Sequence, residues 1–118
     1  MYWEVLIMLN KNIIIYVEDI VRSCAEMTSG GNVAPAIDML GEALRRLLNE
    51  NIEEQWVRDS IEKVNMLYSA CKLLTHPNVD TIMFSDIVFR LTSDTIDYNE
   101  LNKLITLAQA RIRAYSVK

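Results

Sequence analysis

The sequence predicts an all-α fold, in which residues 1–118 form a single domain built as a bundle of four or five helices. Three features predict it. Apolar residues recur in steps of three and four over long segments, which places them on one face of a helix. Three Gly and two Pro leave little material for the turns of a β-sandwich. Acidic residues precede basic ones by four positions, a spacing that stabilises a helix by about 0.2 to 0.5 kcal/mol per pair. These pairs are Glu18–Arg22, Glu42–Arg46, Glu54–Arg58 and Asp59–Lys63.

The first expected helix covers residues 2–28 and carries one apolar column with a second column beside it. The first column contains Trp3, Ile7, Ile14, Val17, Val21 and Cys24. A short N-terminal β-hairpin is the alternative, because the stretches 5–9 and 13–17 are rich in β-formers and are separated by three polar residues. Gly30 and Gly31 end this element, since glycine readily adopts the left-handed conformation that closes a helix.

The second and third helices are expected over residues 35–49 and 52–75. Pro35 suits the first turn of the second helix, because a proline there removes no hydrogen bond from the helix. One face of this helix carries Ile37, Leu40, Leu44, Leu47 and Leu48. The third helix repeats apolar residues in steps of four and three. Its column contains Val57, Ile61, Val64, Tyr68 and Cys71.

Two further helices are expected over residues 80–91 and 97–115. His76-Pro77-Asn78 separates the first of them from the preceding helix, because a proline and the residue before it both disfavour a continuing helix. The inward residues of the shorter helix are expected to be Ile82, Met83, Ile87, Val88 and Leu91. Asp97 and Glu100 have the spacing of a capping box, which predicts the start of the last helix.

The composition limits the classes of function. A net charge of −4 argues against a protein that coats nucleic acid or anionic lipid, since both need a basic surface. The N-terminus does not have the pattern of a secretory signal, and no apolar run reaches the ~20 residues that span a bilayer. We therefore expect a soluble protein without membrane contact in the cytoplasm, or in the cytosol of a host if the chain is a phage or viral product. Cys24 and Cys71 are expected to be reduced thiols of the core.

No catalytic, cofactor-binding or metal-binding constellation stands out, and we expect a protein that is not an enzyme and needs no cofactor. His76 is the only histidine, and zinc sites combine several His and Cys ligands. A weaker alternative is a small magnesium-dependent nucleotide hydrolase that uses acidic residues near the third helix. These are Glu50, Glu53, Glu54, Asp59 and Glu62. The second acidic motif of such enzymes is incomplete, because Met83 stands three residues before Asp86, where that motif has a glutamate.

A nucleic-acid-binding regulator is the alternative function. Residues 101–118 contain no acidic residue, and their basic side chains are the possible contacts to phosphates. These are Lys103, Arg111, Arg113 and Lys118. Basic residues near the C-terminus of a helix also stabilise the helix dipole, which explains them without a ligand.

The expected function is a non-catalytic protein–protein interaction module, such as a small regulator, inhibitor, immunity factor or chaperone. At 51% apolar residues, the chain has more apolar material than so small a monomer readily buries. The excess lies in the N-terminal element, which predicts a homodimer, together with a further, unidentified protein partner. The predicted interface contains Trp3, Leu6, Ile7, Asn10, Ile13, Ile14 and Val17. Asn10 is included because a single amide in an apolar interface can set register and oligomeric state.

Overall fold

A computed structural model of the chain describes the backbone of residues 2–50 and 52–116 and the side chains of residues 12–50 and 52–114. This part of the chain contains five helices and no strand, and 80% of the chain is helical. The helices are α1 (Tyr2–Ser29), α2 (Val33–Leu48), α3 (Gln55–Leu74), α4 (Thr81–Leu91) and α5 (Tyr98–Ser116). The predicted all-α bundle is confirmed, and the hairpin alternative for the N-terminal element is wrong.

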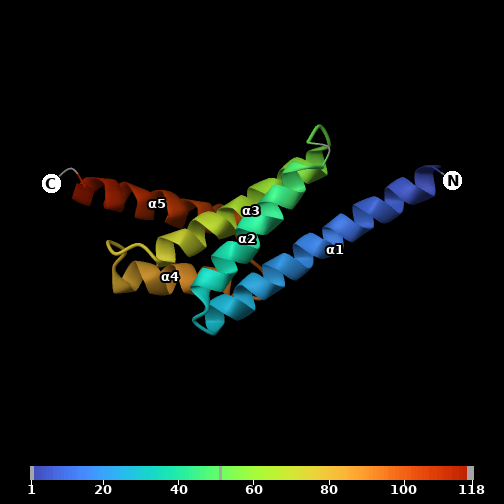
Figure 1. Ribbon diagram of the computed structural model, residues 1–118. Coiled ribbons are helices and arrows are strands. Elements are labelled where there is room, and N and C mark those ends of the chain that lie inside the picture. The colour runs from blue at the N-terminus through green and yellow to red at the C-terminus, as the bar shows by residue number, and fades with distance from the viewer. Residues whose placement is uncertain (1, 51, 117–118) are drawn as a thin grey trace.

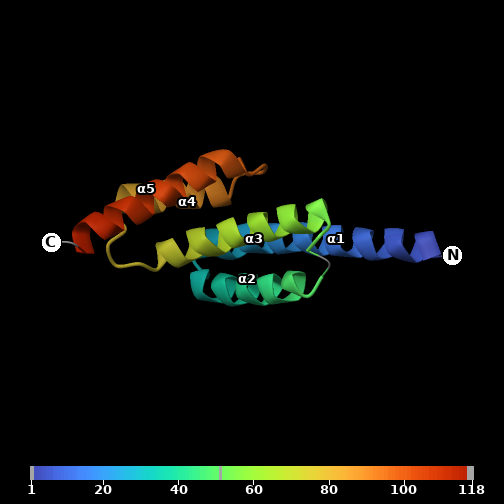
Figure 2. The ribbon, with the colours of Figure 1, turned by 90° about the horizontal axis from the view of Figure 1, so that it is seen from above.

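Helix α3 contacts each of the other four helices. Figure 2 shows α3 between α2 on one side and the antiparallel pair of α4 and α5 on the other, with α1 running along the same bundle. The N-terminal half of α1 extends beyond the connection between α2 and α3 (Figures 1 and 2). This extension contributes to an elongated outline of 60 × 29 × 22 Å.

The core takes one stripe from every helix. On α1 the stripe is Val17, Ile20, Cys24 and Thr28, spaced by three and four residues as one face of a helix requires. The largest fully buried side chains are Leu40, Leu47, Leu67, Ile87, Leu91, Leu101, Val57, Val64, Cys24 and Cys71. Both cysteines therefore lie in the core, as the apolar stripes of the sequence predict.

Two apolar side chains expected on inward faces are instead exposed. Ile82 is 76% exposed on α4 and Leu48 is 60% exposed on α2. Successive helical residues point about 100° apart, so Ile82 cannot share the face of its buried neighbour Met83. Leu48 is displaced in the same way from the buried Leu47, and the prediction that these two residues face inward is wrong.

Local hydrogen bonds explain where the helices begin and end. Gly31 adopts a φ of +78° after α1, and the Asn32 N–H donates to the Met27 carbonyl at 2.8 Å. The Asp97 carboxylate accepts from the Glu100 N–H at 3.2 Å and so caps α5. The Glu100 side chain accepts from Lys103 at 3.2 Å, so the structure shows only the Asp97 half of the predicted capping box.

Candidate interaction surface

The projecting half of α1 is the most apolar segment of the chain. Its sequence includes a run of five apolar residues, 5–9, which is longer than one helical turn of 3.6 residues. Ile14 and Ile15 follow, 45% and 54% exposed, close to the point where α1 joins the core. An apolar helix that extends from a bundle exposes surface that favours association with another apolar surface.

The structure places the predicted interface residues in three different situations. Val17 is 8% exposed and belongs to the core of its own chain. Ile13 is half-buried against that core, and Ile14 is exposed. The side chains of the other predicted interface residues lie outside the described part of the chain. These are Trp3, Leu6, Ile7 and Asn10.

A cation–π contact holds α1 to α2 where the projection starts. The Arg46 guanidinium lies 4.2 Å from the centroid of the Tyr16 ring. Tyr16 directly precedes Val17, the first buried residue of the α1 core stripe in the described part. The contact therefore helps to fix the direction in which the N-terminal half of α1 leaves the bundle.

A second exposed apolar area, missed by the sequence reasoning, lies on α4 and α5. Phe89 is 69% exposed on the same face of α4 as Ile82, and Leu107 of α5 is 46% exposed. Phe89 and Leu107 line a hollow of about 370 Å³ whose rim carries both signs of charge. The sequence does contain a signal for this area. Ile82, Asp86 and Phe89 are spaced by four and three residues, so the two apolar residues share a helix face with a charged one, which is typical of a face in water.

Among the described residues, the predicted nucleic-acid contacts of α5 do not form one free basic patch. Lys103 pairs with Glu100 at 3.2 Å, and Arg111 pairs with Asp80 of the α4 N-terminus at 3.7 Å. Arg113 is exposed, and Lys118 lies outside the described residues. Acidic neighbours thus lower the positive potential that two of the four side chains could offer to a phosphate backbone.

The groups considered for metal or acid–base chemistry have other local roles. His76 accepts from the Asn78 N–H through Nδ1 at 3.1 Å, which fits a residue that shapes the turn around Pro77. Asp59 accepts from the Gln55 side chain at 2.8 Å. Among the described residues, no three His, Cys, Asp or Glu side chains form a group that could hold a metal ion. The absence of a metal or cofactor remains a prediction.

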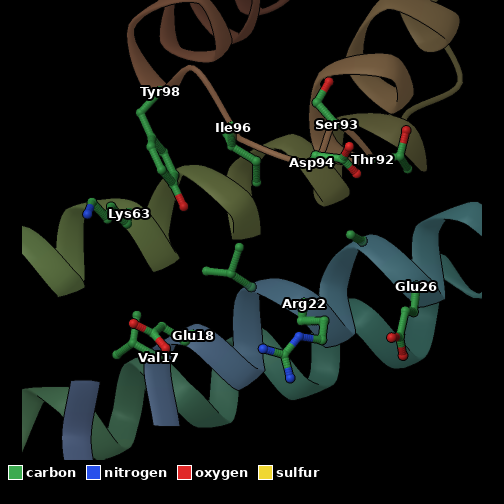
Figure 3. A pocket seen from close by; sticks show the side chains of 12 residues that line it. Val17, Glu18, Arg22, Glu26, Lys63, Thr92, Ser93, Asp94, Ile96 and Tyr98 are labelled. Carbon is green, nitrogen blue, oxygen red and sulfur yellow. The ribbon is translucent and has the colours of Figure 1, made fainter. Parts of the chain in front are cut away.

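An open groove of about 500 Å³ lies between α1, α3 and the α4–α5 connection (Figure 3). Tyr98 extends from the start of α5 with its hydroxyl group directed toward α1, and Lys63 lies 5.6 Å from its ring centroid. Burial raises the pKa of Tyr98, and a negative charge on nearby Cys24 raises it further. The lining mixes short apolar side chains with carboxylates and cations, and the described side chains do not show a nucleophile paired with a base.

None of the described helices is long and apolar enough to cross a membrane. Comparison of the chain with protein-family models, curated proteins and solved structures finds no match.

Proposed function

We propose that the chain is a non-catalytic protein–protein interaction module that forms a homodimer through the projecting half of α1. The observation that carries this proposal is the course of α1, which continues beyond the α2–α3 connection while its sequence stays apolar (Figures 1 and 2). No other described helix runs beside its N-terminal end in either view.

Burial of this segment would stabilise an assembly by about 25 cal/mol for each Å² of apolar surface removed from water. A second copy is the simplest partner, because it presents the same apolar helix and a two-fold axis lets both copies bury it at once. Ile14 and Ile15 extend the surface toward the bundle, so it continues from the projection onto described, exposed side chains.

Such a module would act as a small regulator, inhibitor, immunity factor or chaperone, and its effect would come from contact with a further protein. The described part of the chain supports this class because its conspicuous surface features are apolar rather than catalytic. Affinity capture from the native host, with identification of the retained protein by mass spectrometry, tests this part of the proposal.

Sedimentation equilibrium over a range of micromolar concentrations tests the dimer. We expect a species of twice 13.6 kDa, with a monomer population that grows on dilution. A chain that sediments at 13.6 kDa at every concentration would contradict self-association. Added salt should change the equilibrium little, since an apolar interface is not screened as charge pairs are.

Nucleic-acid binding through α5 is the second candidate, and the exposed Arg113 on a segment without acidic residues favours it. Fluorescence polarisation with labelled duplex DNA and single-stranded RNA at low and moderate salt distinguishes the two candidates. A strongly salt-dependent signal that weakens in Arg113→Ala would support this candidate, and no signal at low salt would remove it.

A further inference from the structure

Two cysteines from different helices meet in the core. Cys24 of α1 and Cys71 of α3 are 1% and 0% exposed, and their Sγ atoms lie 3.8 Å apart. Both are free thiols, and 47 positions separate them in the sequence. The fold thus brings two distant thiols into direct contact.

We propose that Cys24 and Cys71 are a redox-active dithiol that a small peroxide converts into an intramolecular disulfide joining α1 to α3. The two sulfur atoms must approach from 3.8 Å to the ~2.05 Å of an S–S bond. A side-chain rotation with a small shift of α1 against α3 can supply this movement. In a reducing compartment the pair stays as two thiols, so the proposal concerns exposure to an oxidant.

The two thiols take different roles once the pair has lost one of its two protons. Either sulfur can donate the hydrogen bond that joins them, and a bond donated by Cys71 to a thiolate at Cys24 lowers the pKa of Cys24. Cys71 then holds the remaining proton. The hydrogen bond to Cys24 raises the pKa of Cys71, and burial raises it further. Cys24 is therefore the nucleophile and Cys71 the resolving thiol.

Oxidation by hydrogen peroxide proceeds in two balanced steps. The Cys24 thiolate attacks one peroxide oxygen, the O–O bond breaks, and the departing hydroxide takes up a proton to become water, leaving a sulfenic acid on Cys24. The Cys71 sulfur then attacks the Cys24 sulfur, the S–O bond breaks, and the departing hydroxide takes the Cys71 proton. Two thiols thus lose two electrons and two protons, and one peroxide becomes two waters.

Neither cysteine lines the groove in Figure 3, so a small oxidant would reach the pair through a local opening of the groove wall. Val21 and Ala25 belong to that wall and lie three positions before and one position after Cys24 on α1. Tyr98 also lines the groove and lies close enough to Cys24 for a thiolate there to raise its pKa. A peroxide is about the size of a water molecule, whereas a peptide disulfide such as oxidised glutathione could reach the buried sulfurs only if α1 moved away from α3.

The cross-link would change the stability of the fold. It closes a loop across 47 positions and so lowers the conformational entropy of the unfolded chain. For a loop of this length, the folding equilibrium would shift about a thousand-fold toward the native state. The cross-link would also tie the C-terminal half of α1 to α3. The proposal is independent of dimerisation, because both sulfurs lie in the core of one chain.

Intact-mass analysis of the full chain tests the proposal. The reduced protein is desalted, treated with a small molar excess of hydrogen peroxide, denatured and alkylated with iodoacetamide. We expect a mass lower by two hydrogens, no alkylation of either cysteine, monomeric mobility on a non-reducing denaturing gel, and full reversal by dithiothreitol. Wild-type protein that gains oxygen without losing two hydrogens, remains unmodified, or forms covalent dimers would overturn the proposal.

Matched variants and a melting experiment complete the test. Cys71→Ser keeps the nucleophile and should stop at a sulfenic acid that dimedone traps, whereas Cys24→Ser should react more slowly. Equal rates in the two variants would contradict the assigned roles. The oxidised wild type should melt at a higher temperature than the reduced form, and a lower melting temperature would show that the native geometry does not accommodate the bond.

Discussion

The guanidinium of Arg46 on α2 lies over the ring of Tyr16 on α1, 4.2 Å from its centroid. The sequence spacing predicts a different partner for Arg46, namely Glu42 one turn earlier. In the structure Glu42 pairs weakly with Arg45 at 4.0 Å, and Arg46 reaches across to the neighbouring helix. The contact lies where α1 leaves the bundle, so it connects the core with the projecting segment.

A double-mutant cycle measures this contact. We expect Tyr16→Leu and Arg46→Ala to be coupled by about 0.5 to 1 kcal/mol in the free energy of unfolding, the usual range for an exposed cation–π pair. Urea denaturation of the wild type, both single variants and the double variant gives the coupling. Strictly additive losses would mean that the two side chains do not interact in solution.

Val64→Asp tests the core of α3. Val64 is 0% exposed, so an aspartate there would be a buried, unpaired carboxylate, and we expect a loss of at least about 3 kcal/mol in the free energy of unfolding. Glu62→Asp is the matched control, since Glu62 is exposed on the same helix and should change stability by less than about 0.5 kcal/mol. Similar chemical denaturation midpoints for Val64→Asp and the wild type would place that face of α3 in water.

Ile14→Glu tests the location of the dimer interface. Ile14 is 45% exposed, so the single chain should tolerate the change, whereas a glutamate in an apolar interface would be desolvated without a partner. We expect a helical, monomeric protein by circular dichroism and sedimentation, or insoluble protein if the disrupted surface aggregates. Asn65→Glu, at an exposed position of α3, is the control and should remain dimeric. An Ile14→Glu variant that dimerises as well as the wild type would move the interface elsewhere, and the last helix would be tested next.

Protein purified under reducing conditions should contain two free thiols and no metal. This follows from the burial of Cys24 and Cys71 and from the presence of one histidine. Thiol titration in denaturant and elemental analysis check it. A mass deficit of two hydrogens before any oxidant is added, or stoichiometric zinc, would contradict the prediction.

Asp80 joins two helices, and substitutions there separate its two roles. One carboxylate oxygen caps α4 by accepting from the Met83 N–H at 2.8 Å, and the other lies 3.7 Å from Arg111 of α5. Asp80→Ala removes both contacts and should lower the free energy of unfolding by about 0.5 to 2 kcal/mol. Asp80→Asn keeps the capping acceptor and should retain most of that stability, since an exposed ion pair contributes little. Equal losses in thermal melts of the two variants would assign the effect to the ion pair instead of the cap.

The sequence alone predicts four or five helices and places each of the five to within three residues of its bounds, with a hairpin left open as the alternative for the first. Helix formation depends on contacts three and four residues apart and on capping groups at the ends, and both can be recognised locally. Gly31 after α1 and Asp97 before α5 are examples, because each acts on the backbone of its own helix end. The burial of Val64 and Cys71 also follows from their place in a regular apolar column.

The tertiary structure decided which partners the long basic side chains take. Lys63 lies over Tyr98 of α5 and not beside Asp59, and Arg58 donates to the backbone carbonyls of Ile52 and Glu53 at 2.8 Å. An exposed ion pair between helix neighbours is worth only a few tenths of a kcal/mol, so any better group from another segment displaces it. Sequence spacing cannot show which other segment will be near.

Exposure of apolar faces was likewise settled only by the assembly of the helices. Ile82 was expected inward because its helix is apolar, but the core covers the face that carries Met83. The sequence marks the start of α1 as unusually apolar, and the arrangement of the helices shows that this part extends past the bundle (Figure 1). The apolar content of a segment can be read from its own residues. Whether that segment is buried depends on where the other helices end in space, and this is decided by contacts between residues far apart in the chain.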